Sequence, residues 1–385
     1  MPTFFLTAAE HSGDALGASL IHALRKRFPG AQFVGVGGER MAAAGCRLIA
    51  NPVSRSAMLI GALFTESRYW WKRLKEIRAE LRTLKPDVVV PIDSSAINLR
   101  IAAVAREEKI PVCYYVAPQV WASRPWRVKK IAAVVDTLCC ILPFEERYFR
   151  ERGVNGVYVG HPMFDVPAET PETDPARLDP PLPGKNGDLK VAIFPGSRRA
   201  EIDKHMPPML RIMGEIRGKF PRVAFVAVAP SEERAWQIRH HLRSANTPVD
   251  IRVGHADAII RWADLALTKS GTATLQIARH HKPMVVMFAV AWWKWNLFAR
   301  YIINTPYIAL VNILAGREIV PEYIPFHGSP LPVARECIEL LSHPERRAAM
   351  SQELAELVAP LAPSADGTLA ADRVAAEVAK YVKTP

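Results

Sequence analysis

The chain has 385 residues, of which 49% are apolar and 23% are charged, a composition that excludes extensive disorder. This length favours two domains, because a single hydrophobic core rarely grows so large. The formal charge of +12 favours anionic partners, such as nucleic acid, an acidic membrane surface or a phosphorylated substrate, without choosing among them.

The start of the chain and its cysteines predict a cytoplasmic location. The sequence MPTFFLTAAEHSGD has a short apolar run and lacks the charged start of a signal peptide. No stretch reaches the roughly 18 apolar residues of a membrane span. The five cysteines show no CxxC spacing, which favours small buried thiols over a zinc site or a disulfide framework. We expect a cytoplasmic protein that can still touch a membrane.

Short apolar runs alternate with helical patterns through the first half of the chain. Helical patterns include Ala15–Phe28 and Trp70–Leu84. The runs that predict strands are Thr3–Thr7, Gln32–Val36, Asp87–Ile92, Val112–Val116 and Thr137–Leu142. Strands that are apolar on both faces and separated by helices predict a parallel sheet with both faces covered.

Residues 166–188 interrupt this alternation with six prolines, which predicts a linker. The alternation then restarts with strand-like runs at Lys190–Phe194, Val223–Ala229, Asp250–Val253, Leu265–Thr268 and Met284–Phe288. We predict an amino-terminal lobe over 1–165 and a carboxyl-terminal lobe over 189–344. A helical segment over 345–385 would cross back to the first lobe or contact another subunit.

Candidate ligand contacts lie directly after the predicted strands, because ligands of open parallel sheets bind beyond the carboxyl ends of strands. Ser12 and Gly13 stand at a helix start, where free amides suit an anion or a sugar hydroxyl; the alternative is an ordinary cap. Asp93 could take a proton from an attacking hydroxyl, or it could cap the helix that begins near Ser95.

The loop over residues 114–132 mixes aromatic and cationic side chains. Such mixtures stack on nucleic acid or neutralise lipid phosphate, and the alternative is an amphipathic helix with a solvated basic face. The residues concerned are Trp121, Arg124, Trp126, Arg127, Lys129 and Lys130.

Two loops of the second half predict a diphosphate site. Gly196 permits close backbone approach, and Arg198 or Arg199 can bind phosphate oxygens with two hydrogen bonds; the alternative is a structural turn. The run Ser270–Thr272 lies at the start of a helix, where Gly271 leaves the backbone amides open to an anion; the alternative is plain helix capping. The first of these loops is not a Walker motif, and the glycine-containing stretches at 9–17 and 35–40 lack the GxGxxG spacing. Together the two loops suggest a nucleotide-linked substrate.

Two segments, residues 58–82 and 290–307, set Trp and bulky aliphatic residues beside Lys and Arg. Interfacial helices have this mixture; the alternative is a helix whose apolar face packs on the core. The candidate lipid contacts are Met58, Leu59, Ile60, Leu63, Phe64, Trp70, Trp71, Trp292 and Trp293.

Ordered elements along nearly the whole chain resemble the lipid-A-disaccharide synthase family of inverting glycosyltransferases. They include SGDALGA at 12–18, FVGVGGERMAAAGC at 33–46, KPDVVVPID at 85–93, YYVAPQVWASRPWRVKKI at 114–131, PGSRRAEI at 195–202, SGTATLQ at 270–276 and NILAGREIVPE at 312–322. The resemblance implies an α/β fold of GT-B type. Two Rossmann-like, doubly wound parallel-sheet lobes would face a cleft, with carboxyl-terminal helices crossing back.

The resemblance also implies a reaction. A UDP-linked 2,3-diacylglucosamine would donate its sugar to 2,3-diacylglucosamine 1-phosphate, giving the β(1→6) disaccharide 1-phosphate and UDP. The acceptor would lie in the first lobe and the nucleotide mainly in the second. Asp93 would be the general base, with no metal and no cofactor. The implied substrate contacts are Ser12, Gly13, Asn98, Arg198, Arg199, Ser270, Gly271, Thr272, Gln276, Asn312, Arg317 and Glu318.

The family resemblance extends to the setting of the enzyme. It implies peripheral binding to the cytoplasmic face of the inner membrane of a Gram-negative bacterium, with a homodimer possible and no nucleic acid bound. Ala96, Val311 and Gln276 depart from the family pattern, which usually has an acidic residue, Pro and Glu there. The alternatives are a paralogous UDP-sugar glycosyltransferase, an epimerase, or a lipid-binding relative without turnover. The resemblance implies that the family's Glu at position 276 accepts hydrogen bonds from ribose hydroxyls. Because Gln276 lacks that carboxylate, the sequence predicts that Gln276→Glu tightens UDP binding.

Overall fold

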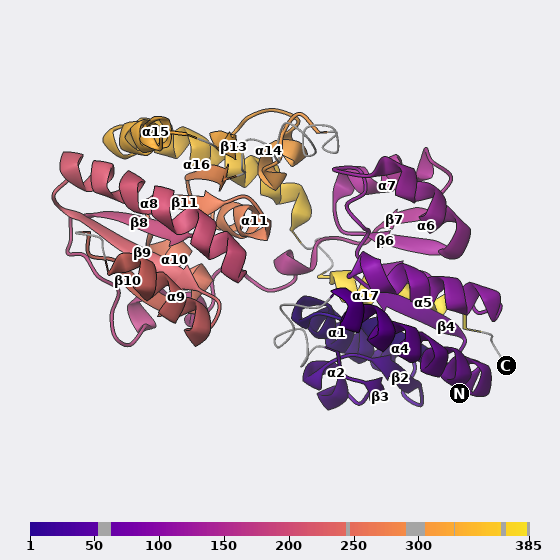
Figure 1. The fold of residues 1–385 in the computed structure, drawn as a ribbon. Coiled ribbons are helices and arrows are strands. Elements are labelled where there is room, and N and C mark those ends of the chain that lie inside the picture. Colours follow the sequence, from indigo (N-terminus) through magenta and orange to yellow (C-terminus); the bar gives the residue numbers. More distant parts are fainter. Residues whose placement is uncertain (53–62, 244–246, 290–304, 327, 363–366, 383–385) are drawn as a thin grey trace. The chain divides into compact units, whose positions relative to one another are not determined.

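The structure is a computed structural model that describes residues 1–52, 63–243, 247–289, 305–326, 328–362 and 367–382. Its contacts divide the chain into two units. One unit combines Met1–Asp165 with Leu361–Pro385, and the other is Val166–Pro360. Each unit is built around one parallel sheet, which confirms the predicted α/β fold (Figure 1).

The first unit has a seven-stranded sheet in the order β3-β2-β1-β4-β5-β6-β7. Its strands are β1 (Thr3–Ala8), β2 (Gln32–Val36), β3 (Arg47–Ala50), β4 (Val88–Ile92), β5 (Cys113–Tyr115), β6 (Thr137–Cys140) and β7 (Gly156–Tyr158). Its helices are α1 (His11–Arg27), α2 (Glu39–Ala43), α4 (Leu63–Leu84), α5 (Ser95–Glu107), α6 (Val128–Val134), α7 (Pro143–Arg150) and α17 (Ala370–Ala379).

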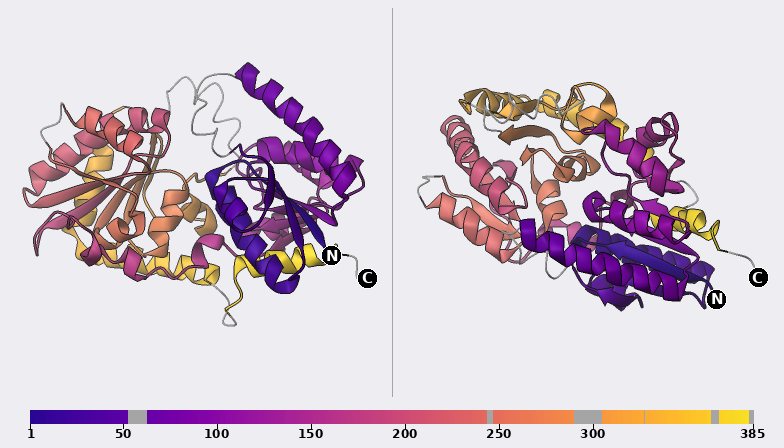
Figure 2. Two further views of the ribbon diagram at one scale, coloured as in Figure 1. Left: turned by 90° about the horizontal axis from the view of Figure 1, so that it is seen from below. Right: turned by 45° about the vertical axis from the view of Figure 1, so that its right-hand side comes forward.

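The central strands β1 and β4 are almost fully buried, as expected for strands whose side chains are apolar on both faces. Helix α1 packs against α2 and α17, and α5 packs against α4 and α6 (Figures 1 and 2). Val374 and Val378 of α17 join the same core cluster as Leu20 and Leu24 of α1. The end of the chain is therefore part of the first unit's core.

The second unit has a six-stranded sheet in the order β10-β9-β8-β11-β12-β13. Its strands are β8 (Leu189–Phe194), β9 (Val223–Ala229), β10 (Asp250–Val253), β11 (Leu265–Lys269), β12 (Met284–Ala289) and β13 (Glu322–Phe326). Its helices are α8 (Arg199–Lys219), α9 (Glu232–Leu242), α10 (Ala256–Trp262), α11 (Thr272–Arg279), α14 (Leu310–Ala315), α15 (Leu331–Ser342) and α16 (Pro344–Val358).

The proline-rich segment 166–188 lies within the second unit and packs on it. Arg261 donates to the carbonyl oxygen of Thr173 at 3.0 Å, and Arg252 donates to that of Pro180 at 2.7 Å. The predicted segment 345–385 is divided between the two units, because α16 contacts α11 and α14 while α17 contacts α1. Across the described ranges, no helix is long and apolar enough to cross a membrane.

Candidate functional site

Each sheet has one point at which the strand order reverses, and ligands of doubly wound folds bind there, beyond the carboxyl ends of the strands. In the first sheet this point lies between β1 and β4, and in the second it lies between β8 and β11. The chain leaves β4 at Asp93, and it leaves β8 and β11 at the two predicted phosphate loops. The fold therefore places the main sequence candidates at its two expected ligand positions.

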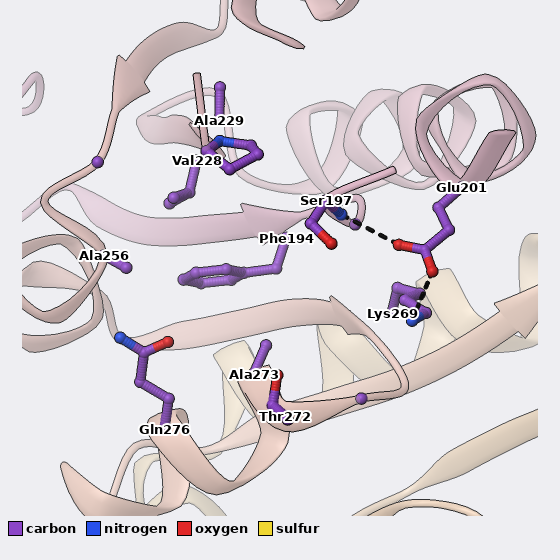
Figure 3. Close-up of a pocket in the computed structure, with 14 residues that line it drawn as sticks. Phe194, Ser197, Glu201, Val228, Ala229, Ala256, Lys269, Thr272, Ala273 and Gln276 are labelled. Atoms are coloured by element: carbon purple, nitrogen blue, oxygen red, sulfur yellow. Dashed lines mark hydrogen bonds and ion pairs between the residues drawn. The ribbon is translucent and has the colours of Figure 1, made fainter. Parts of the chain in front are cut away.

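The second switch point holds a cavity of about 250 Å³. Its lining comes from the loop after β8, the end of β9, the start of α10 and the first turns of α11 (Figure 3). Among the lining residues are Gly196, Ser197, Lys269, Gly271, Thr272 and Gln276. The helix α11 begins at Thr272, so the amides of Thr272 and Ala273 have no partner within the helix and suit an anion, while the Thr274 amide donates to the Gly271 carbonyl oxygen at 3.1 Å.

Glu201 organises the loop after β8 from the first turn of α8. Its Oε2 accepts hydrogen bonds from the backbone nitrogens of Ser197 at 3.1 Å and Arg198 at 3.3 Å, and Lys269 Nζ lies 3.2 Å from Oε1. Burial raises the pKa of Glu201, but Lys269 and the loop amides outweigh burial and hold that pKa below its ordinary value. The carboxylate stays ionised and occupies two backbone amides of the loop.

Gly196 makes this loop possible. Its φ of +119° is a conformation that side chains rarely adopt, and a Cβ there would stand 2.7 Å from Glu201 Cβ. Arg198 and Arg199 follow on the exposed surface, with side chains 79% and 69% exposed. Their ion pairs to Glu201 and Asp203 are 3.8 and 3.9 Å long. Such exposed pairs are worth about 0–1 kcal/mol, so either guanidinium is free to turn to a ligand.

Gln276 lines the far end of the cavity, one turn into α11. Its Nε2 donates to Asp257 Oδ1 at 3.1 Å, and the same oxygen lies 2.8 Å from His280 Nε2. Burial raises the pKa of Asp257, but hydrogen bonds from His280 and Gln276 outweigh it and lower that pKa overall. Gln276 is thus held by an ionised neighbour that sequence reasoning had missed.

Asn312 is fully buried and supports a neighbouring loop rather than the cavity wall. Its Oδ1 accepts from the backbone nitrogens of Ile319 at 2.9 Å and Val320 at 3.1 Å, while Nδ2 donates to Glu322 Oε2 at 3.0 Å. Glu322 in turn accepts from the backbone nitrogens of Ile308 and Ala309. The hydroxyl of Ser270 donates to the carbonyl oxygen of Ile308, which ties this network to the β11 loop.

Two further predicted contacts, Arg317 and Glu318, are exposed. Arg317 Nη1 lies 2.8 Å from Glu353 Oε2, and Glu318 Oε1 accepts from the backbone nitrogen of Glu322 at 3.4 Å. Neither residue lines the cavity, so their predicted contact with substrate stays a prediction.

Asp93 stands at the switch point of the first sheet. Both Asp93 and Ser94 have left-handed backbones, with φ of +54° and +40°, which residues other than Gly rarely adopt. The Asp93 carbonyl oxygen accepts from Tyr114 Oη at 2.6 Å, and its nitrogen donates to the Tyr115 carbonyl at 2.9 Å. Burial raises the pKa of the Asp93 carboxyl, only partly opposed by the Ser94 amide. A raised pKa makes a carboxylate a better base.

The side chain of Asn98 makes hydrogen bonds to the backbone of this turn, and Asn98 is only 1% exposed. Its Nδ2 donates to the carbonyl oxygens of Ile92 at 2.8 Å and Asp93 at 2.9 Å, and its Oδ1 accepts from Thr7 Oγ1 at 2.9 Å. These bonds commit both ends of the amide. Asn98 therefore positions the Asp93 turn.

Helix α1 begins at His11, four residues earlier than its predicted start, so Ser12 and Gly13 lie in its first turn. Ser12 is exposed and Gly13 is buried, with space for a Cβ limited by Ala8 Cβ at 3.3 Å. The neighbouring Asp14 was missed from the sequence. It accepts from the backbone nitrogens of Gly38, Arg40 and Met41 and so caps the start of α2.

The aromatic and basic loop over 114–132 is divided between core and surface. Trp121 is buried and donates through Nε1 to Glu145 Oε1 at 2.9 Å. Burial raises the pKa of Glu145 to about 7, despite that bond and two backbone amides. The exposed members are Arg124, Trp126, Lys129 and Lys130.

Most predicted lipid contacts cannot be placed. Met58, Leu59, Ile60, Trp292 and Trp293 lie outside the described residues, and Leu63 and Phe64 belong to a stretch of α4 whose side chains are not described. Trp71 of α4 is 62% exposed, with Lys75 Nζ 3.6 Å from its ring centroid. Trp70 is partly buried. In the part of the chain that the structure covers, no group of three or more metal-ligating side chains could hold a metal ion.

The chain matches one family of known proteins over most of its length. Residues 4–371 match the family model described as lipid-A-disaccharide synthetase. The lipid-A-disaccharide synthase of Syntrophus aciditrophicus is 35% identical over 355 residues, with 91% of each sequence covered. That of Anaeromyxobacter sp. (strain K) is 37% identical over 369 residues, with 92% of each covered.

Solved structures with the same fold bind UDP compounds. The UDP-GlcNAc 2-epimerase from Neisseria meningitidis, bound to UDP-GlcNAc, has a TM-score of 0.63 at 11% identity, over 94% of this chain and 99% of that one. The Staphylococcus aureus MnaA–UDP structure has a TM-score of 0.61 at 12% identity, over 92% and 91% of the two chains. At these identities the likeness establishes a shared fold.

Proposed function

Because the chain belongs to the lipid-A-disaccharide synthase family, and is therefore a glycosyltransferase that forms the lipid A disaccharide, we propose that each sheet's switch point binds one substrate. The donor, UDP-2,3-diacylglucosamine, would occupy the cavity of the second unit. The acceptor, 2,3-diacylglucosamine 1-phosphate, would bind in the first unit beside Asp93. The observation that carries the donor assignment is the cavity between β8 and β11, where the α11 amides and Lys269 converge.

The donor's diphosphate would lie at the α11 mouth. There, first-turn amides and Lys269 offer positive charge, and the exposed Arg198 and Arg199 can turn inward. These groups would stabilise the negative charge that develops on UDP as the bond to the sugar breaks. Glu201 limits the charge of the site, because it already pairs with Lys269 at 3.2 Å. An entering diphosphate competes with Glu201 for Lys269 and for the loop amides.

The acceptor's 6-hydroxyl would lose its proton to the Asp93 carboxylate as its oxygen attacks the anomeric carbon of the donor. Attack on the face opposite UDP inverts that carbon and releases UDP. Burial favours this role, because it raises the pKa of Asp93 and so strengthens it as a base. Asn98 and Tyr114 would keep the carboxylate in place through the backbone carbonyl that both contact.

We propose that the enzyme works on the cytoplasmic face of the inner membrane, where acylated substrates reside. The charge of +12 favours an anionic lipid surface, and Trp71 beside Lys75 is the kind of pair found at headgroup level. A vesicle flotation assay with and without anionic lipid tests this location. Pairing of two copies of the chain stays a prediction, which sedimentation equilibrium can test.

A calorimetric titration with UDP tests the donor site. Ala273 lines the cavity, and Ala273→Leu adds three carbons to it. Overpacking costs about 1–3 kcal/mol, which predicts UDP binding that is weaker by about fivefold to 150-fold. Ala348→Leu on α16 is the matched control, because Ala348 is an exposed helical alanine of the same unit outside the cavity. Equal UDP affinity in the two variants would place the nucleotide elsewhere.

A further inference from the structure

Three side chains form a hydrogen-bonded cluster at the far end of the second unit's cavity. Asp257 lies at the start of α10, and its Oδ1 accepts a hydrogen bond from Gln276 Nε2 at 3.1 Å. The same oxygen lies 2.8 Å from Nε2 of His280; Gln276 belongs to α11 and His280 directly follows that helix. The side chain of His280 is 2% exposed and that of Asp257 is 28% exposed. The cluster thus joins two helices behind the cavity wall.

The cluster fixes which way the Gln276 amide points. An ionised carboxylate accepts hydrogen bonds and donates none, so the opposite amide orientation would set Gln276 Oε1 against Asp257 Oδ1 in mutual repulsion. With Nε2 committed to Asp257, Oε1 is left on the other side. Figure 3 shows the labelled Gln276 with its nitrogen turned toward the side of Ala256 and its oxygen turned toward the cavity.

The family resemblance implies that the residue at 276 contacts ribose, and the position of that oxygen agrees with such a contact. Gln276 follows Thr272 by one helical turn, which is about 6 Å along α11 at 1.5 Å per residue. If the diphosphate lies at the α11 mouth, the group at this distance is the ribose. Ribose hydroxyls are donors that a fixed acceptor oxygen can read, and both hydroxyls are absent from a 2′,3′-dideoxy nucleotide.

We propose that Asp257, supported by His280, is a positioning residue that presents Gln276 Oε1 to a ribose hydroxyl of the nucleotide. The pair of side chains thereby makes the site selective for ribose. This inference rests on the donor assignment of the proposed function. It also explains why an amide suits position 276, because Asp257 already supplies the carboxylate of this cluster and a second one would repel it.

The test compares the dissociation constants of UDP and 2′,3′-dideoxy-UDP by calorimetry. We expect the wild-type chain to prefer UDP about fivefold to tenfold, the worth of one hydrogen bond. Gln276→Ala and Asp257→Ala should each reduce this preference to about twofold or less, and the double variant should lose no more. The affinity for pyrophosphate, which has no ribose, should stay within twofold throughout.

A matched control exists in the same unit. Asp203 Oδ1 accepts a hydrogen bond from Gln237 Nε2 at 2.7 Å and lies 3.0 Å from His241 Nε2. This cluster has the same three residue types, and none of its members lines the cavity. Asp203→Ala should leave the ratio of the two dissociation constants unchanged.

A swapped pair keeps the proposal falsifiable if Asp257→Ala does not fold. Gln276→Glu combined with Asp257→Asn reverses donor and acceptor in the bond and still turns an oxygen to the cavity. The swapped variant should restore the preference for UDP. An unchanged ratio in Gln276→Ala or in folded Asp257→Ala, or no preference in the folded swapped variant, overturns the inference alone. If the wild-type chain binds no UDP, the donor assignment falls as well.

Discussion

Replacing Asn98 by Ala should uncouple the Asp93 turn from the sheet beneath it. Three hydrogen bonds are lost, to the carbonyl oxygens of Ile92 and Asp93 and from the hydroxyl of Thr7, all in a buried setting. At about 1 kcal/mol for each bond, the free energy of unfolding of the first unit should fall by about 3 kcal/mol.

The same change should slow catalysis more than it weakens donor binding. Asp93 and Ser94 hold left-handed backbones that the Asn98 amide helps to maintain, so its loss lets the carboxylate move. A shift of about 1 Å in a reacting group costs roughly 100-fold in rate. We expect kcat to fall by about that factor while the affinity for UDP, which we place in the second unit, stays within twofold.

Urea denaturation and steady-state UDP release measure these two effects. Asn155→Ala is the control, because Asn155 is an exposed residue of the same unit whose amide bonds are longer, 3.2 Å to the Asp136 carbonyl and 3.1 Å to Thr137 Oγ1. It should cost about 1 kcal/mol or less. The reasoning fails if Asn98→Ala is as stable as the control, or if it is destabilised yet turns over at the wild-type rate.

Three further predictions follow from the two sites. Asp93→Asn should lower kcat by about 10²- to 10⁴-fold. Because burial raises the pKa of Asp93, the wild-type rate should fall as pH decreases through a value above the ordinary 3.8, an acid limb that a pH–rate profile of the variant should lack. Gly196→Ala should lower the melting temperature and weaken UDP binding, since φ is +119° and the new Cβ would meet Glu201 at 2.7 Å; a normal affinity would show that the loop relaxes freely. Gln276→Glu should weaken UDP binding at pH 7.5, because Asp257 lies 3.1 Å from the replaced amide, and tighter binding in a titration would mean that the two carboxylates avoid each other.

The last prediction reverses the one drawn from the sequence alone. Sequence reasoning compared Gln276 with a family pattern and could not place Asp257, which stands 19 residues earlier and meets it only through the packing of α10 against α11. Glu201 was equally hidden, although a Glu three residues after the residue that caps a helix, here Arg198, is a known capping signal. Side-chain partners across elements depend on tertiary packing that no short pattern encodes.

The main strands were predictable because their apolar character on both faces is a local property. The strands β3, β7 and β13 were not predicted. They are edge strands of four, three and five residues that begin with Arg47, Gly156 and Glu322, so none has an apolar run as long as those of the central strands. The residue types at the switch points were also predictable. The roles of these residues were harder to predict. The sequence suggests that Asn98 and Asn312 contact a ligand, whereas in the structure their side chains form hydrogen bonds with backbone groups.

Turnover with the two lipid substrates is the decisive measurement for the proposed glycosyl transfer. Purified protein is incubated with UDP-2,3-diacylglucosamine and 2,3-diacylglucosamine 1-phosphate dispersed in detergent, and products are identified by mass spectrometry. We expect UDP and the β(1→6)-linked disaccharide 1-phosphate in equal amounts, with Asp93→Asn nearly inactive. No disaccharide, or a donor converted to an epimer without use of the acceptor, would contradict it.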